Sequence, residues 1–418
     1  MRPTTEDAVP ATGTEPSPNL WRNRAFNLLW TSQCLSDLGS AMANLALPLL
    51  VLQMTGSPTR AGLVGTTGLL AGMVCRLPAG IVADRFDRRR LMVVCDALRI
   101  VAFAVLGVAV LADAASLAMV LVLVVVNAAA NAVFSTAEHA AVRNLVRPGQ
   151  LSDAVARNEA RSYGTQLAGP QLGGLLFGLG RSLPFLGNAL SYLLSLAALL
   201  AIREPMQEPR DKAVAGPSGR AAGAEGVRFV LGNPFLRALL LIAAPLNMAF
   251  TGMLFAIIVS LQRSGTSSYL VGLASTIFAV GGLLGALAAP SLQRRLRLPT
   301  LILVLSWATA VLMAGSALLS TSVLAAVPLA AAVFLGPTAN AALFGYQAAI
   351  TPDHLQGRVF SVIILAATSA AALAPVLAGL LLDRVSSTAA LMVFALIVGI
   401  AAVTATFSSG IRSMSTGT

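Results

Sequence analysis

Long runs of hydrophobic residues, separated by short polar turns, fill most of the chain. A helix needs about 20 mostly apolar residues to cross the hydrocarbon core of a bilayer. Runs of this length recur along the sequence and predict an all-α membrane protein with twelve membrane-spanning helices. The predicted spans are residues 27–53, 60–82, 91–112, 115–137, 160–180, 183–202, 237–261, 269–290, 299–319, 322–346, 359–382 and 388–407.

One long polar stretch, residues 203–236, divides the spans into two groups of six. Its clustered Pro, Gly and Ser residues are typical of a flexible linker. The residues before the first span are rich in Pro, Thr and Glu, which predicts a disordered tail and not a signal peptide. The expected organisation is a cytoplasmic tail (1–22), an N-terminal six-helix bundle (23–202), the linker (203–236), a C-terminal six-helix bundle (237–408) and a second cytoplasmic tail (409–418).

The two groups of spans resemble each other weakly but systematically. Residues 61–91 align without a gap on residues 271–301, and both segments begin with an apolar residue and a glycine and end in a basic turn. Parallel duplication of a six-helix unit is typical of transporters whose substrate site lies between the halves, near the bilayer midplane. The sequence therefore predicts two pseudo-symmetric bundles with a binding site between them.

The basic residues of the chain are concentrated in the turns between the predicted spans. The formal net charge is +11, from 28 Lys and Arg against 17 Asp and Glu. If both termini are cytoplasmic, most of the basic residues lie on the cytoplasmic side, and only Arg60, Arg181, Arg263 and Arg384 lie in outer turns. Basic residues are retained on the cytoplasmic side of membrane proteins. We therefore expect a multi-pass protein of the bacterial inner membrane, with lipid as its surroundings. The same placement argues against nucleic acid as a partner.

The turn between the second and third spans, "GIVADRFDRRRL" (80–91), has six charged residues among twelve. It resembles the loop signature of the major facilitator superfamily, Gly-x-Leu-x-Asp-Arg-x-Gly-Arg-Arg/Lys. Val82 stands where the signature has Leu, and Asp87 stands where it has the second Gly. The matching residues are Gly80, Asp84, Arg85, Arg88 and Arg89.

This resemblance implies the superfamily fold and a conformational clamp. Asp84 and Arg88 are expected to hold the cytoplasmic helix ends together in the outward-facing state, with the eleventh span, which begins near Arg358, as their partner. The alternative is that these charges only anchor the topology, and for Arg89 and Arg90 both interpretations stand equally.

A second match, "GTQLAGPQLGG" (164–174), lies in the fifth span and resembles the Gly-Pro-x-x-Gly-Gly signature of exporters in the same superfamily. The matching residues are Gly169, Pro170, Gly173 and Gly174. Close helix packing alone would also explain the glycines. The wider phrases "ALPLLVLQMTGSP" and "LPFLGNALSYLLS" resemble the macrolide-efflux and enterobactin-exporter branch. The fourth span lacks the arginine of simple drug–proton antiporters in this family.

Polar side chains inside spans indicate a cavity, because a polar group that faces lipid is costly. Such residues recur in the first, fourth, seventh and tenth spans, which line the central cavity of the superfamily fold. An interhelical hydrogen bond is an equally good explanation for any one of them. The candidates for substrate contact are Gln33, Asn44, Asn127, Asn131, Asn247, Thr251 and Asn340.

Two acidic residues inside spans are candidates for proton coupling. Asp37 lies ten residues into the first span, on the same helical face as Gln33 and Asn44. A charged residue at the centre of a span costs about 2.5–3.5 kcal/mol on insertion scales, so it is rarely kept without a use. Asp96 is the weaker candidate, because Arg99 lies one turn away and a structural ion pair is the simpler interpretation.

Together these observations predict a secondary exporter of amphipathic organic molecules, a drug or antibiotic-like compound, by proton antiport with alternating access. One alternative is a dedicated exporter of a siderophore or another self-made metabolite, and a second is a membrane receptor or enzyme that transports nothing. Neither a phosphate loop nor a second metal ligand near His139 or His354 is present in the sequence, so we expect no enzyme activity, no cofactor and no metal. The expected partners are the small-molecule substrate and protons, and the chain is expected to be a monomer.

Overall fold

The computed structural model describes residues 20–204, 206–207, 220–294 and 298–408. These residues form α-helices and four short 3-10 helices, without a strand, which confirms the predicted all-α class. The first seven helices are α1 (Arg24–Thr55), α2 (Pro58–Arg85), α3 (Arg88–Leu111), α4 (Leu117–Leu145), α5 (Leu151–Leu179), α6 (Leu183–Ala201) and α7 (Arg220–Gly232). The others are α8 (Pro234–Arg263), α9 (Ser268–Gln293), α10 (Leu298–Leu318), α11 (Ala326–Phe334), α12 (Gly336–Ile350), α13 (Gln356–Arg384) and α14 (Ser387–Phe407).

Eleven segments of the described chain are long and apolar enough to cross a membrane, against the twelve expected. The predicted fifth span is the exception: it forms the 29-residue helix α5, but that helix is not among the eleven. Its Gly, Ser and Gln residues lower its hydropathy, and it packs between α1 and α9. The predicted tenth span is one apolar segment, Val323–Ile350, broken into α11 and α12 beside Gly336 and Pro337.

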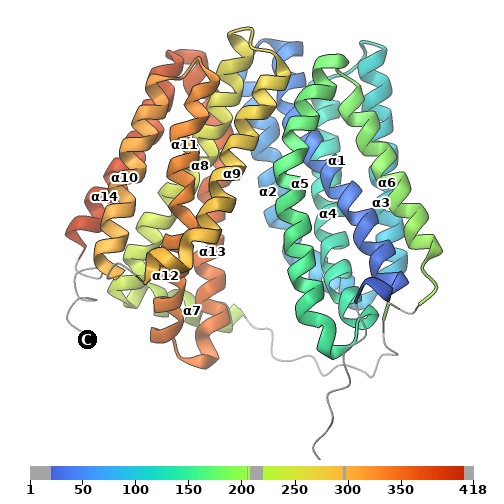
Figure 1. Ribbon diagram of the computed structural model, residues 1–418, viewed down its shortest axis with the longest axis horizontal. Helices are drawn as coiled ribbons and strands as arrows, with labels where there is room; N and C mark the ends of the chain where they lie inside the picture. The colour runs from blue at the N-terminus through green and yellow to red at the C-terminus, as the bar shows by residue number, and fades with distance from the viewer. Residues whose placement is uncertain (1–19, 205, 208–219, 295–297, 409–418) are drawn as a thin grey trace, which may run out of the picture.

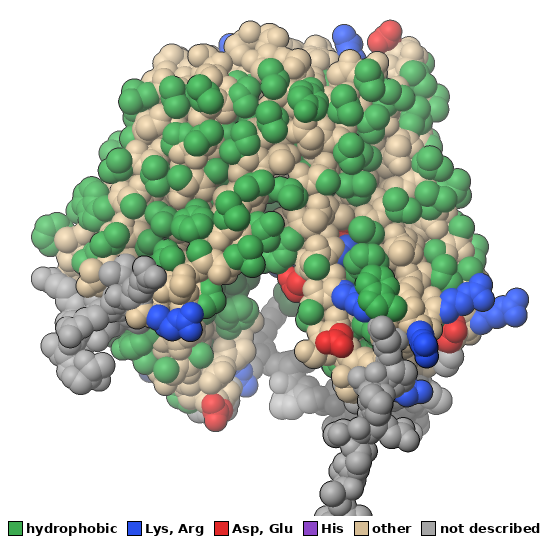
Figure 2. Space-filling model, in the orientation of Figure 1, with side chains coloured by type: hydrophobic (Ala, Val, Ile, Leu, Met, Phe, Trp, Pro, Cys, Tyr) green, Lys and Arg blue, Asp and Glu red, His purple; other side chains and the backbone are tan. Residues whose placement is uncertain are grey.

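Two groups of helices stand side by side (Figure 1). We refer to α1–α6 as the N-terminal bundle and to α8–α14 as the C-terminal bundle. They meet mainly through two helix pairs, α2 with α13 and α5 with α9. The bundles come together at the top of Figure 1, the closed end, and separate at the bottom, the open end, where Figure 2 shows the surface hollowed between them.

Glycines allow the helices to touch at the closed end. A Cβ atom on Gly62 of α2 would collide with the carbonyl oxygen of Pro375, and one on Gly174 of α5 would collide with that of Ser268. In the opposite direction, a Cβ atom on Gly272 of α9 would lie 2.5 Å from the carbonyl oxygen of Pro170. Backbones approach this closely only where the side chain is absent, so these glycines determine how tightly the closed end is sealed.

A polar contact strengthens the seal. The Asp383 carboxylate of α13 accepts hydrogen bonds from the Ser57 hydroxyl at 3.2 Å, from the Thr59 amide at 3.0 Å and from the Thr59 hydroxyl. These donors surround the N-terminus of α2, where the unpaired amides and the helix dipole favour an anion. Deeper in the same interface, the Val376 amide donates to the Thr66 hydroxyl at 3.1 Å.

The predicted linker, residues 203–236, contains a helix, so its description as a flexible segment is wrong for the second half. Helix α7 contacts α8 and α13. Its residue Val230 is buried in the core of the C-terminal bundle, and the Arg358 guanidinium of α13 lies 2.5 Å from the Glu225 carboxylate. The Pro and Gly signal of 205–219 obscured this short amphipathic pattern. Residues 205 and 208–219 lie outside the described part of the chain, as do 1–19 and 409–418 of the predicted tails.

Candidate functional site

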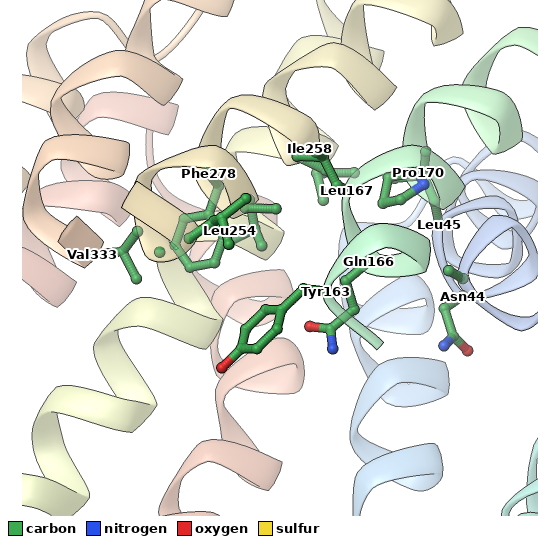
Figure 3. Close-up of a pocket in the computed structure, with 15 residues that line it drawn as sticks. Asn44, Leu45, Tyr163, Gln166, Leu167, Pro170, Leu254, Ile258, Phe278 and Val333 are labelled. Carbon is green, nitrogen blue, oxygen red and sulfur yellow. The ribbon is translucent and has the colours of Figure 1, made fainter. Parts of the chain in front are cut away.

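A cavity of about 410 Å³ lies between the bundles, below the closed end. Helices α1 and α5 form one wall, and α8, α9 and α11 form the other (Figure 3). The second wall is largely apolar. Its side chains include Leu254, Ile258, Phe278 and Val333. The first wall carries polar groups from Asn44, Tyr163 and Gln166.

The Gly-Pro motif of α5 builds the polar wall. Gly169 and Gly173 pack directly on Ala41 and Met42 of α1, where added Cβ atoms would be too close. Gln166 of α5 and Asn44 of α1 thereby belong to the same wall of the cavity. Because Gly174 faces α9 instead, the motif serves two interfaces, one within the N-terminal bundle and one across the closed end.

A second, charged pocket of about 230 Å³ lies inside the N-terminal bundle, among α1, α3, α4 and α5. Its centre is Arg161 of α5, whose Nε lies 3.0 Å from Asp37 Oδ2 and whose Nη1 lies 2.8 Å from Glu138 Oε1. The side chains of Arg161 and Glu138 are only 8% and 6% exposed, whereas that of Asp37 is 39% exposed. One buried arginine therefore holds two carboxylates, and Asp37 is the one that solvent reaches.

The two pockets lie next to each other along α1 and α5. On α1, Asp37 lines the charged pocket and Asn44 lines the cavity. On α5, the Gln166 side chain in the cavity donates a hydrogen bond of 3.0 Å to Ser162 in the charged pocket. Asn44 in the cavity wall is about two helical turns from Asp37, or roughly 10 Å along the helix.

Asp96 belongs to a different network. Its side chain is fully buried, lies 3.7 Å from the Arg99 guanidinium and accepts a 2.7 Å hydrogen bond from Ser195. The Arg99 guanidinium also lies over the rings of Phe134 and Tyr192, at 5.1 and 5.0 Å from their centroids. The ion pair expected from the sequence spacing is present, and its burial favours a structural role.

The predicted substrate contacts are dispersed. Of the seven candidates, Asn44 lines the central cavity, while Gln33 and Asn131 line the charged pocket. Gln33 donates to Ser195 at 3.1 Å, and Asn131 accepts from Arg99 at 3.1 Å. Both side chains therefore serve the buried network of α1, α3, α4 and α6.

The other four candidates are not among the residues that line the central cavity. Asn127 accepts a hydrogen bond from the Tyr192 hydroxyl at 3.3 Å. Asn247 donates to the Ala243 carbonyl of its own helix at 2.8 Å. Thr251 is half-buried on α8 and Asn340 is exposed on α12.

Sequence reasoning missed Glu138 and Arg161. The predicted fourth span ended one residue before Glu138, and Arg161 is only the second residue of the predicted fifth span, so neither was considered as a charge inside the membrane. One signal was available: Glu138 follows Asn131 by seven residues, two helical turns, and so shares its face.

The loop signature ties the N-terminal bundle together at the open end. The Arg88 guanidinium donates to the carbonyl oxygens of Ala140 and Met206, at 3.2 and 3.4 Å, and Arg89 donates to that of Leu200 at 2.9 Å. Arg358 pairs with Glu225 of α7. The clamp between this loop and α13 is expected only in a state whose open end is shut. In this structure that end is open.

Comparisons with known proteins agree with this architecture. The sequence model of a family described as the Major Facilitator Superfamily matches residues 29–363. "Multidrug efflux pump Tap" of Mycolicibacterium fortuitum is 29% identical over 90% of this chain and 93% of its own. "Macrolide efflux protein A" of Streptococcus pyogenes is 22% identical over 64% and 66%. A solved bacterial homologue of the iron transporter ferroportin superposes with a TM-score of 0.74 at 18% identity, over 94% of this chain and 100% of that one.

Proposed function

Because the chain belongs to the major facilitator superfamily of membrane transporters, we propose that it exports amphipathic organic molecules across the bacterial cell membrane in exchange for protons. The observation that carries this proposal is the position of a largely apolar cavity next to a solvent-accessible carboxylate inside a buried ion cluster. The similarity to a multidrug efflux pump and to a macrolide efflux protein supports a drug or antibiotic-like cargo.

Alternating access requires one end of the cavity to be shut while the other is open. The closed end is held by glycine contacts and by the hydrogen bonds of Asp383, which join the two bundles. Such contacts can break together when the bundles rock. We infer that the open end faces the cytoplasm, because the arginine-rich turn at 85–90 lies there.

Asp37 is proposed as the proton-coupling residue. With Asp37 ionised, Asp37, Glu138 and Arg161 carry one net negative charge, and with Asp37 protonated they carry none. Arg161 remains paired with Glu138 in either state, so no buried charge is left alone. The cluster can thus accept and release one proton without losing its fold, as a coupling site must.

The test of the proposal is transport by the full-length chain in sealed vesicles. We expect rhodamine 6G to move against its concentration gradient when a pH gradient is imposed, and the movement to stop when a proton carrier dissipates that gradient. Consumption of the dye without movement would indicate an enzyme. If the dye is neither taken up nor consumed, the proposed export is contradicted.

The proposed orientation predicts the result of reporter fusions. A reporter joined after Arg203 and another joined at the C-terminus should both show activity typical of the cytoplasm. The physical reason is the concentration of arginine in the turns on that side. A fusion in the α1–α2 turn at Gly56 is the control and should report the periplasm. A periplasmic signal at Arg203 would contradict the orientation.

The loop signature gives a further prediction. We expect Asp84→Asn to reduce vesicle transport sharply at normal membrane abundance, because the outward-facing clamp loses its acidic member. Arg90→Gln in the same turn should have a mild effect. If both substitutions have equally small effects at matched protein amounts, the clamp is contradicted. The loop charges then serve only to anchor the topology.

A further inference from the structure

Ser275 is an unusual residue in the cavity wall. It lies on α9, where it is 6% exposed, and it lines the cavity. Its hydroxyl has no hydrogen-bond partner among the described residues. A buried hydroxyl without a partner is rare in native proteins, because it loses its hydrogen bonds to water and gains none in return. The next residue, Thr276, donates to the Leu167 carbonyl of α5 at 3.0 Å and so fixes this part of α9 against the opposite wall.

The opposite wall has hydrogen-bonding capacity of another kind. Asn44 and Gln166 both line the cavity, and each lies four residues before a proline, Pro48 in α1 and Pro170 in α5. Proline has no amide hydrogen, so the carbonyls of Asn44 and Gln166 lose the donor that a regular helix would supply. Within a membrane, such a carbonyl is tolerated where it lines a cavity or finds another partner.

These three groups, which we call the band, belong to residues of opposite cavity walls. Ser275 lies in the α9 wall, and Asn44 and Gln166 lie in the wall formed by α1 and α5. Next to the band, Leu254, Phe278 and Val333 present apolar surface. The cavity thus has a hydrogen-bonding edge, to which the band adds acceptors, and an apolar face.

We propose that Ser275 and the carbonyls of Asn44 and Gln166 form a substrate subsite that selects amphipathic molecules with N–H or O–H donors on one edge. This inference rests on the proposed export function and specifies its substrate class. The apolar body of the molecule packs against α8, α9 and α11, while its donors satisfy the band. Because the carbonyls only accept, an analogue whose donors are alkylated loses these bonds and leaves polar groups unpaired.

The first experiment uses two fluorescent probes of the same charge. Rhodamine 6G has two secondary N–H groups, and tetramethylrhodamine ethyl ester has none. Binding to the purified full-length chain is measured by fluorescence anisotropy. We expect rhodamine 6G to bind about three- to tenfold more tightly, the range of one net hydrogen bond, and Ser275→Ala to remove most of this preference. Binding of the alkylated probe should stay within about twofold.

The matched control is Ser260→Ala. Ser260 is also a buried serine whose hydroxyl has no partner among the described residues, but it lies on α8 and does not line the cavity. This variant should retain the probe preference of the wild type. If Ser275→Ala weakens both probes equally, the hydroxyl has only a structural role and the subsite is contradicted.

The second experiment restores a missing amide. Pro48→Ala supplies an N–H to the Asn44 carbonyl without changing a residue that lines the cavity, so the preference for rhodamine 6G should fall. Pro245→Ala is the control, because the carbonyl it satisfies belongs to Leu241, outside the cavity. If neither probe binds and neither is transported by the wild type, the export function itself is contradicted. Binding with an unchanged preference in both Ser275→Ala and Pro48→Ala overturns the subsite alone.

Discussion

Asp37→Asn is expected to abolish transport driven by a pH gradient while substrate binding remains. Asparagine imitates the protonated carboxyl group, so the Arg161–Glu138 ion pair stays intact and the fold is retained. The variant can no longer alternate between charged and neutral forms, which removes the proposed link between proton movement and the two open states. In sealed vesicles, uphill transport of rhodamine 6G should fall to the level of vesicles without the protein.

Substitutions at two other acidic residues distinguish a loss of proton coupling from a loss of folding stability. Asp153→Asn is the matched control: it changes an exposed acid on α5, outside the charged pocket, and should leave transport unchanged. Asp96→Asn should instead lower thermal stability, because Asp96 is fully buried between Arg99 and Ser195. If Asp37→Asn still drives uphill transport with the wild-type pH dependence, Asp37 is not the coupling residue.

Gly174→Leu is expected to abolish transport by preventing the closed end from forming. A side chain at this position collides with the backbone carbonyl of Ser268 on α9, and no change of side-chain rotamer relieves a contact with backbone. The bundles must therefore separate at α5 and α9. Gly178→Leu provides the control on the same helix, because nothing lies within 4 Å of a Cβ atom there.

Cysteine labelling measures the predicted opening. Leu254→Cys places a thiol in the cavity wall of a chain whose native Cys34, Cys75 and Cys95 have been replaced. A membrane-impermeant thiol reagent applied from the periplasmic side should label this residue faster in Gly174→Leu than in Gly178→Leu. Full transport by Gly174→Leu, or equal labelling of both variants, would show that this contact does not seal the cavity.

The Gly-Pro motif shows what a sequence resemblance can determine and what it cannot. The motif can be recognised in the sequence of α5. The sequence does not show, however, whether a given glycine packs within the N-terminal bundle or contributes to the closed end. In the structure Gly173 faces α1 and Gly174 faces α9, so adjacent glycines belong to different interfaces. The direction in which each residue points depends on the placement of α5 between two neighbours, and only the folded chain fixes that placement.

The sequence by itself determined the all-α class, the family and nearly all of the helices, because the length of an apolar run reports directly on its ability to cross a bilayer. It also made Asp37 a candidate for proton coupling, because an acid inside such a run is conspicuous. It could not determine which side of a helix faces the cavity. In a membrane helix both the lipid-facing and the protein-facing sides are apolar, so the pattern that orients a helix in a water-soluble protein is weak.

Only the tertiary structure decided which polar groups act together. Asp37, Glu138 and Arg161 lie on three helices and meet because α1, α4 and α5 pack around one pocket. Asn127 and Asn247 are directed to partners outside the cavity, while Ser275, which the sequence did not distinguish from other serines, is left in its wall without a partner among the described residues. Charge and hydrogen-bonding capacity are encoded locally, but their pairing depends on contacts between segments far apart in the chain.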